Sequence, residues 1–181
     1  MLDHFKQSPF YKSLSLSWKE GIPASVMQSI ADDYAIPLAL FLGATPVEIG
    51  LLVAVPTLIS SVLQLWATKV VDLIGSRLRC LVSSTTGQAF SLLPIVFLPC
   101  LTGSWRIGAF ITLVTFFRIF GSLISTVWGS LTSDYLPAEE RSGYFGWRSG
   151  IVGVAGILGT IWGGVLLFSY RGTLQAIGFM I

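Results

Sequence analysis

The sequence predicts an all-α membrane protein, because long apolar runs alternate with short polar segments. Of its 181 residues, 53% are hydrophobic and only 11% are charged, whereas soluble domains carry about 25% charge. A helix needs about 20 mostly apolar residues to cross the hydrocarbon of a bilayer. Five segments reach that length, so we expect spans at residues 22–42, 46–66, 80–101, 106–131 and 149–169.

The two ends of the chain lie outside these spans. Residues 1–20 hold no apolar core of signal-peptide length, so we expect an N-terminal segment before a bundle over 21–181. Tyr11, Leu14 and Trp18 recur at helical spacing, which fits either an interfacial helix or a loosely ordered tail. A sixth apolar segment starts near Leu174, and eight residues rise only about 12 Å. The sequence therefore predicts either a fragment or a truncated reading frame that ends within its sixth span.

Basic residues predict the orientation of the chain, because Lys and Arg collect in cytoplasmic loops. One set of loops holds eight of them: Lys6, Lys12, Lys19, Lys69, Arg77, Arg79, Arg141 and Arg148. The opposite loops hold only Arg106 and Arg171. We therefore expect a cytoplasmic N-terminus in a plasma or inner membrane. The net charge of +2 reflects this asymmetry, and it gives no reason to expect nucleic-acid binding.

Between the second and third spans stands Asp72-Leu73-Ile74-Gly75-Ser76-Arg77, a glycine-broken loop with an acid and a base. It resembles the signature loop of the major facilitator superfamily, a family of secondary transporters. Asp72, Gly75 and Arg77 match the pattern, and Thr68 replaces its usual first glycine. The resemblance implies the N-terminal half of that fold, built as two inverted three-helix repeats, with a missing C-terminal half as its partner.

A second motif follows the fourth span and resembles the fourth-to-fifth loop of a bacterial branch of the superfamily. The matching residues are Asp134, Pro137, Arg141, Tyr144, Phe145, Gly146 and Arg148. In the family, charges of these two loops form a cytoplasmic gate. The resemblance thus implies a gate of Asp72, Gly75, Arg77, Asp134 and Arg141. The alternative is that the arginines only enforce topology.

Two adjacent acids, Asp32 and Asp33, lie near the midpoint of the first span. A charge in the bilayer centre costs about 3 kcal/mol or more, so it persists only beside water or a partner. Like charge and desolvation both favour a protonated carboxylate, as a proton carrier requires. Arg118 in the fourth span stays charged and needs an anion. We expect these three residues to form a proton or substrate-cation site; the alternative is an ion pair that only fixes helix register.

Other polar and small residues in the spans carry weaker predictions. Gln28, Gln64 and Gln88 could each face the substrate pathway or only bond a neighbouring helix. Gly146, Gly159, Gly163 and Gly164 are expected to pack helices closely. The last three resemble the Gly-Pro-x-x-Gly-Gly pattern of the family's antiporters, except that Thr160 replaces the proline. The resemblance favours export over uptake.

The sequence therefore favours secondary transport of a small solute, coupled to protons and directed outward. An uptake symporter or facilitator of the same fold stays open, as does an inactive half that needs a partner half. A membrane enzyme is disfavoured, because the single histidine is His4 and no Asp-x-x-Asp or His-x-x-His pair occurs. Cys80 and Cys100 lie about 30 Å apart on one expected helix, beyond disulfide reach. We expect no metal and no cofactor.

Overall fold

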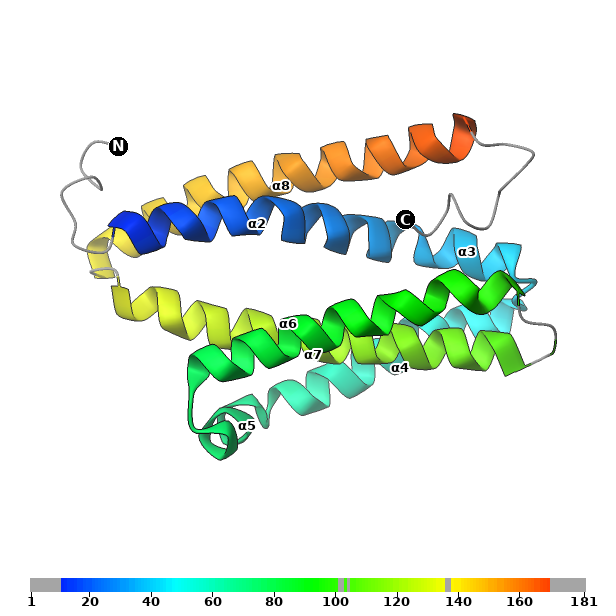
Figure 1. Ribbon diagram of the computed structural model, residues 1–181, viewed down its shortest axis with the longest axis horizontal. Helices are drawn as coiled ribbons and strands as arrows, with labels where there is room; N and C mark the ends of the chain where they lie inside the picture. The colour runs from blue at the N-terminus through cyan, green and yellow to red at the C-terminus, as the bar shows by residue number, and fades with distance from the viewer. Residues whose placement is uncertain (1–10, 101–102, 104, 136–137, 170–181) are drawn as a thin grey trace. The chain divides into compact units, whose positions relative to one another are not determined.

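The computed structural model describes residues 11–100, 103, 105–135 and 138–169 (Figure 1). Every regular element in this part of the chain is a helix. The elements are α2 (Tyr11–Asp33), α3 (Ala35–Phe41), α4 (Pro46–Gln64), α5 (Ala67–Ile74), α6 (Arg77–Leu92), the 3₁₀ helix η1 (Leu93–Cys100), α7 (Trp105–Tyr135) and α8 (Ala138–Ser169). The expected sixth segment, from Leu174, lies outside the described residues.

Four helical segments among the described residues are long and apolar enough to cross a membrane. They are Pro46–Gln64, Arg77–Cys100, Trp105–Leu131 and Arg141–Ser169. They correspond to the second to fifth spans expected from the sequence, and they confirm a helical, multi-pass membrane fold. The described residues hold no fifth helix of this kind, because the first expected span does not form one continuous helix.

The expected span 22–42 is instead divided between α2 and α3, with the break at Tyr34. Pro37 explains the break, since proline has no N–H to donate and its ring collides with the carbonyl four residues earlier. That carbonyl belongs to Asp33, the last residue of α2. Helix α2 also begins earlier than expected, at Tyr11, so residues 11–20 are neither a separate interfacial helix nor a loose tail.

Proline also changes the third span. Helix α6 ends at Leu92, and the chain continues as the 3₁₀ helix η1 to Cys100. Pro94 cannot donate to the carbonyl of Phe90, so the α-helical ladder stops there.

The second span begins as expected, because Thr45 and Glu48 form a capping box in which the Thr45 N–H donates to Glu48 Oε2 at 2.8 Å.

The loop between the second and third spans is shorter than expected. Gly75 ends α5 with φ +70°, and Ser76 caps α6 by accepting from the N–H of Arg79. A left-handed φ suits glycine because it has no Cβ. The glycine-broken turn is therefore present, but Asp72 lies within helix α5 rather than in the loop.

The described helices fall into two compact units, which are taken separately. The first holds α2 and α8, which lie side by side (Figure 1). The second holds α3 to α6, η1 and α7 up to Leu131. Its core is formed by buried apolar side chains of α3, α4, η1 and the start of α7: Leu38, Ala39, Leu42, Leu52, Ile95, Leu98, Ile107 and Phe110.

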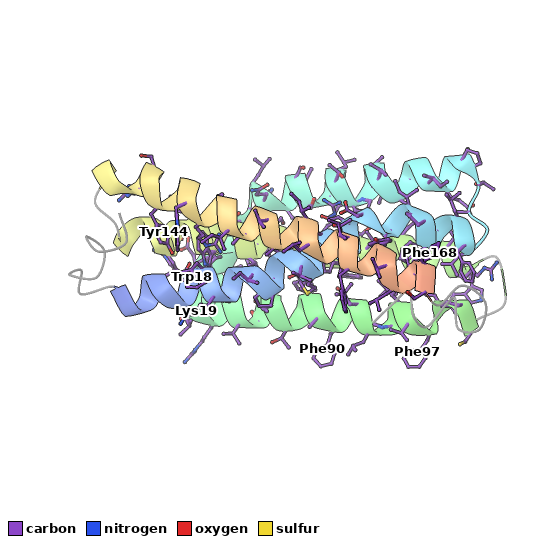
Figure 2. The ribbon with its side chains drawn as sticks, turned by 90° about the horizontal axis from the view of Figure 1, so that it is seen from above. Trp18, Lys19, Phe90, Phe97, Tyr144 and Phe168 are labelled. Atoms are coloured by element: carbon purple, nitrogen blue, oxygen red, sulfur yellow. The ribbon has the colours of Figure 1, made fainter. Side chains whose placement is uncertain are left out.

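Large apolar side chains also cover the outer faces of the helices. Phe90 and Phe97 point away from the second unit, with exposed fractions of 65% and 64% (Figure 2). A soluble protein rarely exposes contiguous apolar surface of this kind, whereas in a membrane protein such surface faces lipid.

Helix α8 begins at Ala138, well before the expected residue 149, so Arg141 to Arg148 are helical and not part of a loop.

Candidate functional site

The two adjacent acids at the end of α2 make different hydrogen bonds. Asp32 is half-buried and accepts from Gln28 Nε2 at 3.1 Å, one turn earlier on the same helix. Asp33 is exposed and accepts from Thr160 Oγ1 of α8 at 2.6 Å. One carboxylate is therefore bound within its own helix, and the other links α2 to α8.

Thr160 is bonded to α2 through its backbone as well. The Tyr34 hydroxyl donates to the Thr160 carbonyl at 2.6 Å, next to the bond with Asp33. Gly164 leaves room for that hydroxyl, since a Cβ there would lie 3.0 Å from it. Asp33, the last residue of α2, thus bonds the side chain of Thr160, and Tyr34, the next residue, bonds its backbone.

A stripe of small residues on α8 lets the two helices approach closely. A Cβ at Gly156 would lie 2.6 Å from Ser29 Oγ, and one at Gly163 would lie 2.8 Å from the Tyr34 ring. At Gly159 the obstacle is backbone, because a Cβ would lie 3.1 Å from Val26 Cα. Only glycine fits this separation, and close packing of this kind drives helix association in lipid.

Gly146 is an exception to the expected packing glycines. Apart from its chain neighbours and its own helix backbone, no described heavy atom lies within 4 Å of its Cβ position, so no close packing contact at Gly146 is found among the described residues. The reason is its place on the helix: residues 152, 156, 159 and 163 recur every three or four positions along one face, and 146 lies off that face. Ser25 Oγ, by contrast, donates to the carbonyl of Val152 on it at 2.7 Å.

The other end of the pair is aromatic and basic. The rings of Trp18 and Trp147 meet edge to face, with centroids 5.9 Å apart, and Lys19 Nζ lies 5.8 Å from the Trp18 ring centroid (Figure 2). A Cβ at Gly21 would lie 2.9 Å from Arg148 Nη2. Helices α2 and α8 are therefore parallel, with their N-terminal ends together.

The remaining pathway residues belong to the second unit. Arg118 is half-buried on α7, Gln88 is buried on α6, and Gln64 is exposed at the end of α4. Near Gln88, a Cβ at Gly87 would lie 2.6 Å from the Phe120 ring. Since Arg118 and the two acids belong to different units, their pairing stays a prediction.

The expected gate residues are likewise divided. Asp72, Gly75 and Arg77 are exposed in the second unit, and Arg141 is half-buried in the first. The side chain of Asp134 lies outside the described residues. The gate therefore stays a prediction.

In the part of the chain that the structure describes, no three His, Cys, Asp or Glu side chains gather as metal ligands would.

Sequence reasoning missed Thr160 and Tyr34 as members of the site. Thr160 was noticed only as a departure from the antiporter pattern, and Tyr34 not at all. The hydroxyl of Thr160 in an apolar span could have indicated a functional position, because a hydroxyl in lipid needs a hydrogen-bond partner. The spacing of residues along α8 does not predict that this partner is Asp33 of α2.

Comparison with known proteins gives one match. The family model described as Major Facilitator Superfamily matches residues 17–181, a range that includes all four membrane-length segments and residues of both units. No curated protein and no solved structure matches the chain.

Proposed function

Because the chain belongs to the major facilitator superfamily, we propose that it carries a small solute across a cell membrane in exchange for protons. Members of this superfamily are secondary transporters, and a multi-pass membrane protein is what the four apolar segments indicate. The finer parts of the proposal are the coupling ion, the direction of transport and the residues that carry the proton.

The observation that supports proton coupling is the position of Asp33. Its carboxylate is exposed and accepts from Thr160 of α8, and residues 149–169 of α8 contain no charged side chain. An ionisable group at membrane depth persists only where it faces water or a partner. The face of the α2–α8 pair that carries Asp33 would therefore form one wall of an aqueous path.

Proton binding at this position would change the balance between two conformations. In its ionised form Asp33 attracts a cation, and Arg118 is the proposed partner because it stays charged. Once protonated, Asp33 loses that attraction. A ligand shifts a conformational equilibrium only through its different affinity for the two states, and the acid–arginine interaction would supply that difference. Asp32, with Gln28, would be an adjoining part of the same path.

The remaining parts of the proposal concern topology and direction. The common end of α2 and α8 carries Lys19 and Arg148, which supports a cytoplasmic N-terminus in a plasma or inner membrane. Asp72, Arg77, Asp134 and Arg141 would form a cytoplasmic gate, and a second half of the transporter would supply the opposite wall of the path. The glycines near the end of α8 support export.

The test measures proton movement in inverted membrane vesicles from cells that express the protein. A pH-sensitive dye reports the pH change when members of a panel of organic cations are added. We expect Asp33→Asn to abolish the pH change, and Arg118→Ala to reduce it strongly. Glu20→Gln is the matched control, because it neutralises an exposed acid on the same helix and should leave the signal intact.

The sign of the pH change separates exchange from the alternative of uptake symport. Exchange releases protons from the vesicles as the cation enters, whereas symport moves both in the same direction. Full proton-coupled transport by Asp32→Asn, Asp33→Asn and Arg118→Ala alike would refute the site assignment. Transport without any pH change would indicate a facilitator.

A further inference from the structure

Thr160 lies between an acid and a backbone carbonyl. Its Oγ1 is 2.6 Å from Asp33 Oδ2 and 3.3 Å from the carbonyl oxygen of Gly156, one turn earlier on α8. A hydroxyl has one proton to donate and two lone pairs with which to accept. The Thr160 hydroxyl donates to Asp33 in the structure, and a carboxylate without a proton can only accept.

A proton on Asp33 would reverse this hydrogen bond. The carboxyl O–H would then donate to Thr160 Oγ1, and the threonine hydroxyl would turn its own proton toward the Gly156 carbonyl. Thr160 keeps its proton throughout, and the only proton gained is the one on Asp33. Every donor has an acceptor in both states, and the exchange needs only a rotation about the C–O bond of the threonine.

Few other titratable groups face Asp33 in this unit. Helix α8 contributes none, because residues 149–169 are uncharged and lack ionisable side chains. Helix α2 contributes Asp32, which accepts from Gln28, and Tyr34, whose hydroxyl donates to the Thr160 carbonyl. The tyrosine bond fixes the backbone of Thr160, so its hydroxyl can turn while its main chain stays in place.

We propose that Thr160 is a positioning residue that detects whether Asp33 carries a proton and transmits the change to the contact between α2 and α8. This inference rests on the proposed proton-carrying role of Asp33. The Gly156 carbonyl, which receives the hydroxyl proton in the protonated state, belongs to the residue whose Cβ position lies 2.6 Å from Ser29 Oγ. A change in the Thr160 bond therefore involves a residue of α8 that packs closely against α2.

The test is an infrared titration of the Asp33 carboxyl group in the purified protein in lipid. The C=O stretch of the protonated acid is followed against pH, and its loss in Asp33→Asn assigns the band. Thr160 bonds both forms of Asp33, but a hydrogen bond to the charged form is about twice as strong as one to the neutral form, so removing the hydroxyl favours the protonated form. We expect Thr160→Val to move the titration midpoint up by about one pH unit, from the difference between the two hydrogen bonds.

Two variants serve as controls. Thr160→Ser keeps the hydroxyl and should titrate close to the unchanged protein. Thr112→Val removes a threonine of α7 whose hydroxyl donates to the carbonyl of Gly108 on the same helix at 2.8 Å, and it should leave the midpoint unchanged. If Thr160→Val does not fold, Thr160→Ala removes the same hydroxyl without added branching.

An unchanged midpoint in a folded Thr160 variant that lacks the hydroxyl would overturn the inference. Equal shifts in Thr160→Ser and Thr160→Val would also overturn it, because packing and not the hydroxyl would then be responsible. The titration does not depend on transport. A shifted midpoint in a protein whose transport moves no protons would refute the proposed exchange while the hydrogen-bond reversal stands.

Discussion

Replacing Gly159 by alanine is expected to push α2 and α8 apart. The added Cβ would lie 2.9 Å from Val26 Cγ1 and 3.1 Å from Val26 Cα. The valine side chain can turn aside, but its Cα belongs to the backbone of α2. The two helices must therefore separate by a few tenths of an ångström, and the hydrogen bonds between them lengthen.

The magnitude follows from two opposing effects. Forcing an extra methyl group into a close-packed contact costs about 1–3 kcal/mol. Replacing glycine by alanine within a helix stabilises it by about 0.5–1 kcal/mol. The net loss for Gly159→Ala is then about 1 kcal/mol. Gly153→Ala is the matched control on the same helix, because no heavy atom lies within 4 Å of its Cβ position, and it retains only the favourable effect.

Unfolding of the purified protein in detergent, followed by tryptophan fluorescence, measures both changes. The Trp18–Trp147 contact makes this signal sensitive to the α2–α8 pair. Gly159→Ala should unfold at lower denaturant concentration than the unchanged protein, and Gly153→Ala at an equal or higher one. If Gly159→Ala is as stable as Gly153→Ala, the close approach of the two helices is refuted.

Three further changes test local features of the fold. Cysteines at Ser29 and Gly156, whose Cβ positions lie 3.7 Å apart, suit a disulfide and should cross-link on oxidation in a background without native cysteines. A Ser29 and Gly153 pair should not, and equal cross-linking of both pairs would contradict the packing. Gly75→Ala forces a side chain to adopt φ +70°, which should cost about 1–2 kcal/mol in detergent unfolding; no loss would mean that the turn differs. Thr45→Ala removes a helix cap, and about 1 kcal/mol should be lost, with Thr45→Ser restoring it; failure of serine to do so would rule out the capping box.

The sequence predicted the position of most spans because their limits have strong local causes. Thr45 and Glu48 form a recognisable cap, and the second span begins beside them. The fourth span holds no charged residue apart from Arg106 and Arg118, and its helix begins within one residue of the expected start. The first expected span is divided at Tyr34 in the structure, because the apolar content of residues 22–42 concealed the effect of Pro37 on the carbonyl of Asp33. Helix α8 begins at Ala138, before the expected span at residue 149, because that span marked only the apolar part of the helix.

The candidate site was only partly predictable for a different reason. Asp32, Asp33 and Arg118 stand out in any apolar span, since charge at membrane depth is costly. Thr160 does not stand out, because threonine is common in membrane helices and its importance comes from a bond to another helix. Contacts between α2 and α8 join residues more than 120 positions apart. Helical periodicity reports which residues share a face, but not which face of another helix they meet.

Access of water to Asp33 tests the central claim most directly. In a cysteine-free background, Asp33→Cys and Ile157→Cys are exposed to a membrane-impermeant thiol reagent while the protein is in its membrane. Ile157 is the control, because its side chain is 63% exposed on α8 and is apolar, as a lipid-facing residue should be. We predict that position 33 is labelled and that position 157 is not. If position 33 stays as unreactive as position 157 in every condition of pH and added cation, the proposed aqueous path along α2 and α8 does not exist.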